Sequence, residues 1–193
     1  MSDSAKLFYK GQEFEFPVIV GTENEPAIDI AKLRSDTGLI TLDSGFKNTG
    51  STTSSITFLD GEEGILRYRG YRIEDLAEKS SFMEVAYLLI YGELPTQAQF
   101  DDFTKQITYH TLVHEDIKKI LDGFPSNAHP MGVLSSLICS LSAFYPDSLN
   151  PNSTPEEVNL SMIRLLAKMP TFAAWAYKNK VGHPVNYPDN SLD

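Results

Sequence analysis

The sequence predicts a mainly α-helical fold with a small β-rich region at its amino end. Residues 1–70 hold stretches in which apolar and polar side chains alternate, separated by turns that contain glycine. Residues 71–193 instead hold repeated helix-start signals, each followed by apolar residues at helical spacing. At 193 residues the chain is long enough to bury a core without disulfide or metal support. We therefore expect a turn-rich β region over residues 1–70 and a helical region over residues 71–193.

Two β-hairpins are predicted in the amino-terminal region. In the first, Phe14 and Phe16 alternate with glutamates, so one face of the strand is expected to be buried. Each hairpin has two strands joined by a short turn: residues 6–9 with 12–20, and residues 54–59 with 65–69. The stretch 43–53 between them is rich in Gly, Ser and Thr and is predicted to be a loop.

The helical region is predicted from its start signals. Ser81, Thr96 and Thr154 each stand three residues before a glutamate or glutamine, which is the spacing of a capping box. Pro155 fits the first helical position, where its missing N–H costs nothing. The predicted helices cover residues 73–79, 81–91, 96–111, 114–121, 130–144, 155–168 and 171–180.

Two of these helices carry little or no charge. Residues 130–145 contain no charged side chain, and such a helix is expected to be buried on all sides. Residues 1–70 are too loop-rich to cover it together with residues 171–180. We therefore expect self-association through both helices, or packing against a further segment of a longer chain. The alternative is that the uncharged helix is an ordinary central helix of a helical domain. Cys139 is expected to be an unreactive thiol in the core.

Composition excludes several classes of partner. The net charge of −10 argues against binding to nucleic acid or to anionic membranes. The amino end lacks the basic and apolar regions of a signal peptide, and no apolar run is long enough for a membrane span. The single cysteine fits a reducing compartment. We expect a cytoplasmic protein without nucleic-acid or membrane partners.

Motifs for catalysis and metal binding are weak. His110 and His114 have the spacing of two zinc ligands on one helical face. However, Thr111 stands where a metalloprotease carries its glutamate, so we expect no metal site. The acidic pairs at 62–63, 101–102 and 156–157 are expected to be structural. No P-loop, dinucleotide fingerprint or nucleophile elbow is present, and no catalytic residue is assigned.

Six blocks, in this order, resemble the amino-terminal part of citrate synthase. They are residues 56–71, 84–89, 92–96, 129–131, 143–145 and 168–171. The strand-rich first 45 residues are similar to the extension found in the bacterial hexameric branch. The resemblance implies part of a helical large domain that works as a dimer or a trimer of dimers. It also implies a transferase of the tricarboxylic acid cycle, which condenses acetyl-CoA as co-substrate with oxaloacetate and needs no cofactor.

The family's two histidine motifs, D-H-E-x-N and G-P-L-H-G-G, do not occur in these 193 residues. None of the four histidines lies in either context, and His129 is expected to be structural. We therefore interpret the chain as an amino-terminal fragment without the small domain, inactive by itself. The alternatives are a fragment of 2-methylcitrate synthase, or a non-catalytic interaction or regulatory module.

An allosteric nucleotide site is also implied by the resemblance. Members of the hexameric branch that NADH inhibits hold it away from the active site, at positions matching His110, Thr111, Tyr145, Arg164 and Lys168 here. Arg164 and Lys168 would face the diphosphate as fixed charges. Those members carry an arginine where this chain has Tyr109, and losing one such contact costs about 1.5–3 kcal/mol. The alternative is that Arg164 and Lys168 form a solvated helix face.

Overall fold

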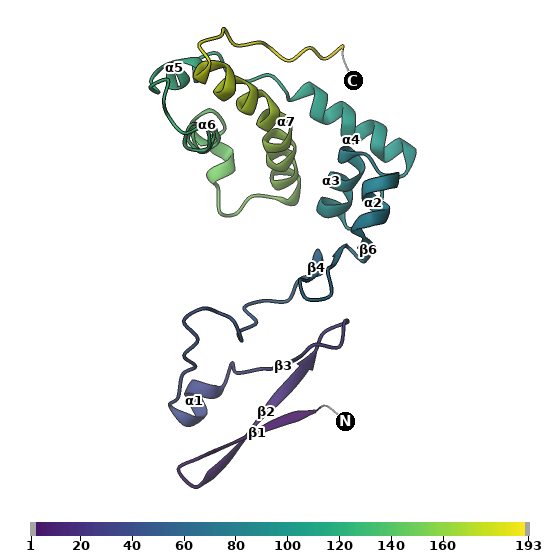
Figure 1. Cartoon of the computed structure of the whole chain (residues 1–193), viewed down its shortest axis with the longest axis vertical. Helices are drawn as coiled ribbons and strands as arrows, with labels where there is room; N and C mark the ends of the chain where they lie inside the picture. Colours follow the sequence, from purple (N-terminus) through teal and green to yellow (C-terminus); the bar gives the residue numbers. More distant parts are fainter. Residues whose placement is uncertain (1–2, 192–193) are drawn as a thin grey trace. The chain divides into compact units, whose positions relative to one another are not determined.

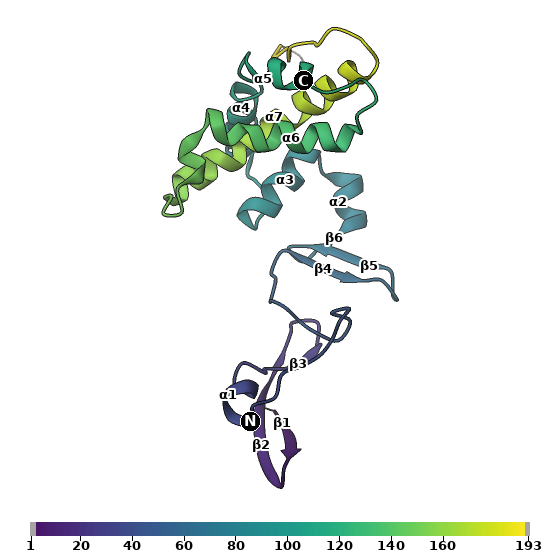
Figure 2. The ribbon, with the colours of Figure 1, turned by 90° about the vertical axis from the view of Figure 1, so that its left-hand side faces the viewer.

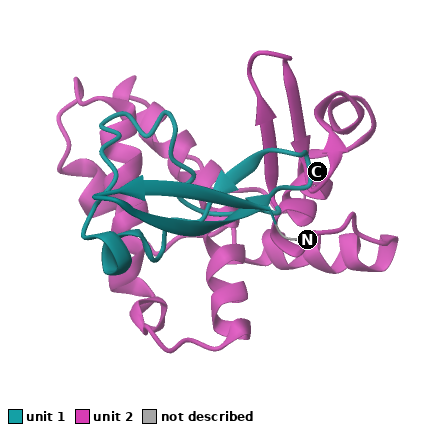
Figure 3. Ribbon diagram, turned by 90° about the horizontal axis from the view of Figure 1, so that it is seen from below, with its two compact units in different colours: residues 1–55 teal, residues 56–193 magenta. Residues whose placement is uncertain are grey.

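The computed structural model of the protein describes residues 3–191. The chain divides into two compact units, residues 1–55 and 56–193, which Figure 3 distinguishes by colour. The second predicted hairpin therefore lies in the same unit as the helices, whereas the sequence predicts it as part of a β-rich region over residues 1–70.

The first unit is a three-stranded antiparallel sheet with one short helix. Its elements are β1 (Ser4–Tyr9), β2 (Gln12–Val20), β3 (Pro26–Ile28) and α1 (Leu33–Thr37), and the strand order is β1-β2-β3. The predicted first hairpin is confirmed, with Leu7 opposite Phe14. Its turn uses left-handed backbone at Lys10 and Gly11. The third strand and the helix lie outside the prediction.

The loop after α1 is organised by one carboxylate. Asp43 accepts hydrogen bonds from the backbone N–H of Asn48 and the hydroxyl of Thr49. These bonds stabilise the ionised carboxylate, so the pKa of Asp43 is lowered from its ordinary value. The prediction of a loop over residues 43–53 is confirmed.

The second unit begins with a small antiparallel sheet (Figure 2). Its strands are β4 (Thr57–Asp60), β5 (Ile65–Tyr68) and β6 (Tyr71–Arg72), in the order β4-β5-β6. The turn between β4 and β5 is held by Asp60, whose carboxylate accepts from the N–H groups of Glu62 and Glu63. This acidic pair is therefore part of a turn, as predicted.

Helices make up the rest of the second unit (Figure 1). They are α2 (Ile73–Lys79), α3 (Phe82–Tyr91), α4 (Gln97–Tyr109), α5 (Ile117–Asp122), α6 (Pro130–Phe144) and α7 (Pro155–Lys180), with a 3-10 turn at Pro146–Leu149. The three predicted capping boxes, at Ser81, Thr96 and Thr154, are all present. Predicted and observed bounds agree for α2 and α6.

The prediction of two helices over residues 155–180 is wrong. The structure has one helix, α7, with Pro170 inside it. A proline in a helix interior removes one backbone hydrogen bond and usually interrupts the helix. Here Ile163 and Ala167 before the proline and Phe172 and Trp175 after it are all buried. Burial of apolar side chains on both sides of the proline offsets the lost bond.

The core of the second unit lies where α5, α6 and α7 pack together, with α6 running across α7 (Figure 2). The buried residues are Ile117, Leu121, Val133, Leu137, Leu141, Phe172, Trp175 and Ala176. A second contact joins α3, α4 and α7. There the rings of Tyr87, Tyr91 and Phe103 pack together, and the Tyr91 hydroxyl donates to Asn159.

One prediction about α6, that Cys139 lies in the core, is wrong, whereas burial of the whole helix by a second copy or a further segment stays a prediction. The helix buries Val133, Leu137 and Leu141 on one side only, while Met131 is 60% exposed. Cys139 is exposed too, not part of the core. The reason is geometric, because α5 and α7 approach α6 from a single side and the small residues line the opposite side. Within residues 3–191, none of the helices combines the length and apolar character that crossing a bilayer requires.

Candidate functional site

The structure brings the five predicted nucleotide-site residues together from three helices. His110 is the residue that ends α4, and Thr111 follows it. Tyr145 is the residue that ends α6. Arg164 and Lys168 lie one turn apart in the middle of α7. Residues separated by more than 50 positions in the chain therefore meet where the ends of α4 and α6 approach α7.

Lys168 is the centre of this cluster and is only 2% exposed. Its ammonium donates to the carbonyl oxygen of His110 at 2.6 Å and to that of Leu112 at 2.5 Å. One turn further on, the Thr171 hydroxyl donates to the carbonyl of Thr111 at 3.0 Å. The carbonyls of three successive residues are thus held by side chains of α7, which fixes the turn after α4.

The electrostatics of Lys168 are those of a buried cation. Burial lowers its pKa from 10.5 to about 8, and the neighbouring charge of Arg164 acts in the same direction. The two carbonyl hydrogen bonds oppose this effect because they favour the ammonium form. At neutral pH the side chain is therefore still mostly charged.

Arg164 completes a pair of cations beside an aromatic ring. Its guanidinium carbon lies 4.4 Å from the centre of the Tyr145 ring, and the Lys168 ammonium lies 5.6 Å from it. The Nε of Arg164 is buried without a hydrogen-bond partner among residues 3–191. No carboxylate in that part of the chain forms an ion pair with Arg164 or Lys168. Two close cations without a counter-charge are suited to an anion.

Sequence reasoning missed Asn190. Its side-chain oxygen lies 2.9 Å from the Thr111 hydroxyl, whose one proton it shares with the carbonyl of Thr108 at 3.0 Å. The amide nitrogen of Asn190 donates to the same carbonyl of Thr108 at 3.0 Å. Asn190 also borders an open groove of about 460 Å³ along α4, lined by Phe100, Asp101, Thr104, Lys105, Thr108 and Tyr109. The sequence separation of 79 residues explains the omission, because no local pattern links Asn190 to Thr111.

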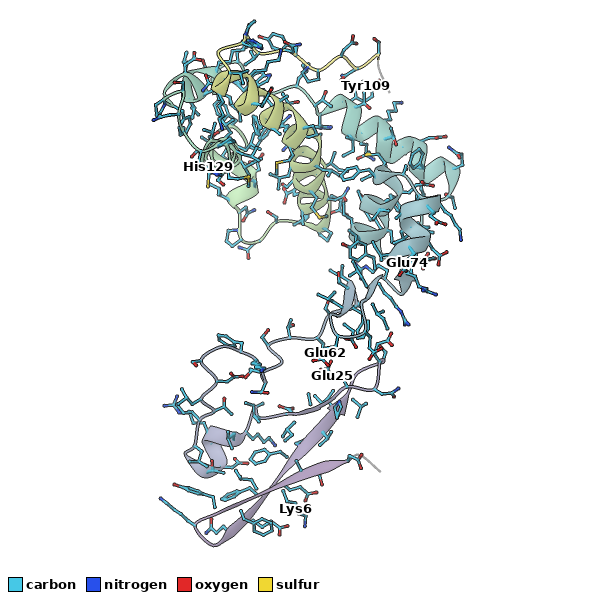
Figure 4. All side chains as sticks on the ribbon, viewed as in Figure 1. Lys6, Glu25, Glu62, Glu74, Tyr109 and His129 are labelled. Carbon is cyan, nitrogen blue, oxygen red and sulfur yellow. The ribbon has the colours of Figure 1, made fainter. Side chains whose placement is uncertain are left out.

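Tyr109 lies at the end of α4 (Figure 4) and is 72% exposed. The ammonium of Lys105, one turn earlier, lies 5.9 Å from the centre of its ring. The side chain is therefore free to stack on a planar group, and Lys105 brings a positive charge to the same place.

The remaining sequence candidates have structural roles. The His110 ring bonds through Nδ1 to the carbonyl of Gln106, and the His114 ring stacks on Phe144 at 4.7 Å. No group of three or more potential metal-binding side chains occurs in the part of the chain that the structure describes. His129 begins α6 (Figure 4), where its Nδ1 accepts from the N–H of Met131. This is the structural role predicted for it.

The other two acidic pairs contact their own helices. Asp101 and Asp102 accept from Gln97 and Gln106, each four residues away on α4. Glu157 closes the capping box of α7. The hydrogen bonds of Asp101, Asp102 and Glu157 are thus made within their own helices, which is the structural role predicted for them.

Comparison with known proteins gives a consistent set of matches. The family model "Citrate synthase, C-terminal domain" matches residues 45–193. Citrate synthase 1 of Mycobacterium tuberculosis (strain ATCC 25618 / H37Rv) is 55% identical over 190 residues, which cover 98% of this chain and 44% of that protein. The chain therefore spans less than half the length of this relative.

Two solved structures show the same similarity. The citrate synthase of Thermotoga maritima MSB8 is 31% identical with a TM-score of 0.66, covering 79% of this chain and 38% of the other. That of Pyrobaculum aerophilum is 30% identical with a TM-score of 0.68, covering 91% of this chain and 41% of the other. The helical arrangement described above is thus shared with a known class of structures.

Proposed function

The chain belongs to the citrate synthase family, and from this premise we propose that it functions as part of an enzyme that condenses acetyl-CoA with oxaloacetate to citrate and CoA. The observation that carries the proposal is 55% identity to Citrate synthase 1 over 98% of the chain. That degree of similarity favours neither a 2-methylcitrate synthase nor a separate interaction module. The tricarboxylic acid cycle is the pathway that this activity would serve.

A chimera tests the proposal. These residues would replace the corresponding part of Citrate synthase 1, and CoA release from acetyl-CoA and oxaloacetate would be followed with a thiol reagent. We expect a turnover within tenfold of the parent enzyme. A chimera that folds, judged by its helical signal, but releases no CoA would contradict the proposal.

We propose that the 193-residue chain is inactive without the rest of such an enzyme. The reaction needs a base at the methyl carbon and a group that stabilises the resulting oxyanion. Neither of the family's histidine motifs is among these residues. The purified chain, mixed with both substrates, is expected to release no thiol above a blank. Release above the blank would contradict the proposal.

We propose that the cluster around Lys168 is an allosteric site for a nucleotide with a diphosphate, and by resemblance NADH. Support comes from the cations Arg164 and Lys168, which have no carboxylate partner among residues 3–191, and from the Nε of Arg164, which has no hydrogen-bond partner there. The exposed ring of Tyr109, which stands where those relatives carry an arginine, offers a stacking surface for a base, and the ammonium of Lys105 lies 5.9 Å from the centre of that ring. The reaction itself would use acetyl-CoA as co-substrate and no cofactor.

Titration calorimetry with NADH at low salt tests the site. Because a charge-assisted contact to phosphate contributes about 1.5–3 kcal/mol, Arg164→Met is expected to weaken binding at least tenfold. Lys180→Met removes an exposed cation from the end of the same helix and is expected to leave the affinity unchanged. Absence of heat with the unaltered chain would contradict the proposal.

We propose that the protein is cytoplasmic and has no nucleic-acid or membrane partners. We also propose that the chain associates with a second copy through residues 130–145 and 171–180. The supporting observation is that both stretches expose apolar side chains, with Met131 60% and Tyr177 63% exposed. Light scattering is expected to give at least a dimer. Ala173→Arg, on the exposed side of α7, is expected to give a monomer, whereas Asn152→Ala is not. A monomeric parent chain would contradict the proposal.

A further inference from the structure

We infer that the polar network around Lys168 couples anion binding at Arg164 and Lys168 to the docking of the segment that follows α7, residues 183–191. The inference rests on the proposed anion site, and it adds the effect that a bound anion has on this segment. An anion that engages Lys168 loosens the attachment of this segment, and a loosened segment favours the anion.

The segment is attached to the rest of its unit at three places. The Trp175 indole N–H donates to the carbonyl of Asn186 at 2.7 Å. The Tyr187 hydroxyl donates to Glu115 at 2.7 Å and contacts the ammonium of Lys118. The third attachment is Asn190, through Thr108 and Thr111 as described above. In Figure 1 the segment is the yellow stretch of irregular chain that returns from α7 towards the end of α4.

Thr111 connects this segment to the cation pair. Its backbone carbonyl is held by Thr171 of α7, and the carbonyls on either side of it are held by Lys168. Its hydroxyl has one proton, which Asn190 at 2.9 Å shares with the carbonyl of Thr108 at 3.0 Å. The position of the turn after α4 therefore determines whether Thr111 can reach Asn190, and Lys168 and Thr171 together hold the turn in this position.

The donors of Lys168 give the direction of the coupling. An ammonium has three N–H donors, and two of them are committed to the carbonyls of His110 and Leu112. The side chain is 2% exposed, so a phosphate group that takes more than one donor displaces a carbonyl. Arg164 is only partly buried, and its Nε has no hydrogen bond to lose. An anion that binds Arg164 and takes two donors of Lys168 draws Lys168 away from the turn.

The released carbonyls would leave the turn over residues 110–112 with one of its three anchoring bonds, from Thr171 to the carbonyl of Thr111. The weakest of the three attachments is then the one through Thr111 and Asn190, because it depends on the turn. By linkage, the factor by which the anion weakens docking equals the factor by which undocking strengthens anion binding. This reciprocity makes the inference testable from both sides.

Hydrogen exchange of the whole chain with inorganic pyrophosphate as the probe provides the first test. Calorimetry establishes binding first, and exchange is then measured with and without saturating pyrophosphate. We expect amides in residues 187–191 to exchange at least threefold faster with the anion, and amides in the middle of α6 to be unchanged. Trp175, the single tryptophan, packs edge-on against Tyr187 and is expected to shift its emission to the red.

Matched variants provide the second test. Asn190→Ala removes both bonds of the amide side chain, and we expect it to bind pyrophosphate about threefold more tightly than the parent chain. Asn186→Ala is the control, because the attachment at that residue uses only its backbone carbonyl, and its affinity is expected to be unchanged. Lys168→Met is expected to abolish the anion's effect on exchange in the segment.

The two hypotheses fail differently. If pyrophosphate binds the parent chain but leaves exchange in residues 187–191 unchanged, the coupling is wrong and the anion site stands. An unchanged affinity in Asn190→Ala has the same meaning. If pyrophosphate does not bind the parent chain at all, the proposed anion site is wrong and the coupling fails with it.

Discussion

The two units of this protein stabilise themselves in different ways. Among the described residues of unit 1, only Phe16 and Leu33 are buried apolar side chains. Unit 2 has a continuous core in which Leu137, Phe172 and Trp175 are completely buried. Because burial of apolar area is the main favourable contribution to folding, unit 2 gains far more from tertiary packing. Unit 1 depends instead on strand pairing, which is local in the sequence.

The same contrast shows in what each unit leaves uncovered. Unit 1 exposes several large apolar side chains: Phe8, Ile19, Val20, Ile28, Ile40, Leu42 and Phe46. In unit 2 the exposed apolar side chains include a group on α6 and α7, opposite the core. A small three-stranded sheet encloses too little volume to bury all of its apolar side chains. A helix that packs on one side buries only the apolar side chains of that side.

Trp175→Ala is expected to have the largest effect, because it removes the largest side chain from the core of unit 2. The expected loss is about 3–5 kcal/mol of unfolding free energy, measured by urea denaturation and far-ultraviolet circular dichroism. Tyr177→Ala, two residues away and 63% exposed, is the control and is expected to change stability by less than about 1 kcal/mol. Equal losses of stability in the two variants would contradict the view that one side of α7 is packed in the core and the other is not.

Lys168 is expected to make unit 2 sensitive to alkaline pH. Its pKa is about 8 in the folded chain and 10.5 for an exposed lysine, so between these values the unfolded chain holds the proton more tightly. Stability is therefore expected to rise as the pH increases from 8 towards 10.5, by at most about 3 kcal/mol. Below pH 8 both states are protonated, and the cost of burying the charge is fully present.

Urea titrations at pH 7.5 and 9.5 measure this effect. Lys168→Met is expected to remove the rise, and Lys180→Met to retain it, because Lys180 is exposed. A parent chain whose stability does not change over this interval would show that the carbonyl bonds of His110 and Leu112 cancel the cost of burial.

Phe16→Ala tests the shallow packing of unit 1. We expect a loss of about 2 kcal/mol, below the cost for a fully enclosed phenylalanine, because the surrounding residues are already partly exposed. Amides of β1 and β2 are expected to lose protection from hydrogen exchange while those of α6 and α7 keep it. Simultaneous loss of protection in both units would show that they unfold together.

Thr154→Ala is expected to have the smallest effect, about 1 kcal/mol, because it removes one capping hydrogen bond at the start of α7. Asn152→Ala, in the preceding loop, is the control. In Thr154→Ala we expect faster amide hydrogen exchange than in the parent chain, and only in the first turn of α7. An effect as large as that of Trp175→Ala would mean that local capping, and not the core, sustains unit 2.

Local rules predicted most of the secondary structure. The first hairpin, the capping boxes and the bounds of α6 all follow from residues close together in the chain. Pro170 shows where such rules stop, because its local signal for interruption is overruled by burial on both sides. Cys139 shows the same for exposure, because composition indicates an apolar helix but not which side of it is covered.

The candidate site was predictable only in part. The resemblance supplied five residues, and the structure brings them together around Lys168. Asn190 was not predicted, nor was the engagement of Lys168 with two backbone carbonyls. A carbonyl carries no residue identity, so no sequence pattern can indicate which carbonyls a buried ammonium will meet.

The amino-acid sequence by itself determined the family, the predominance of helices and the start of each capped helix. These depend on interactions between neighbouring residues, or on similarity that extends along the whole chain. The tertiary structure alone decided that α7 continues through Pro170, that α6 has one uncovered side and that Lys168 holds the turn after α4. Each of these depends on which distant segments come into contact, and such contacts are determined by the packing of the chain as a whole.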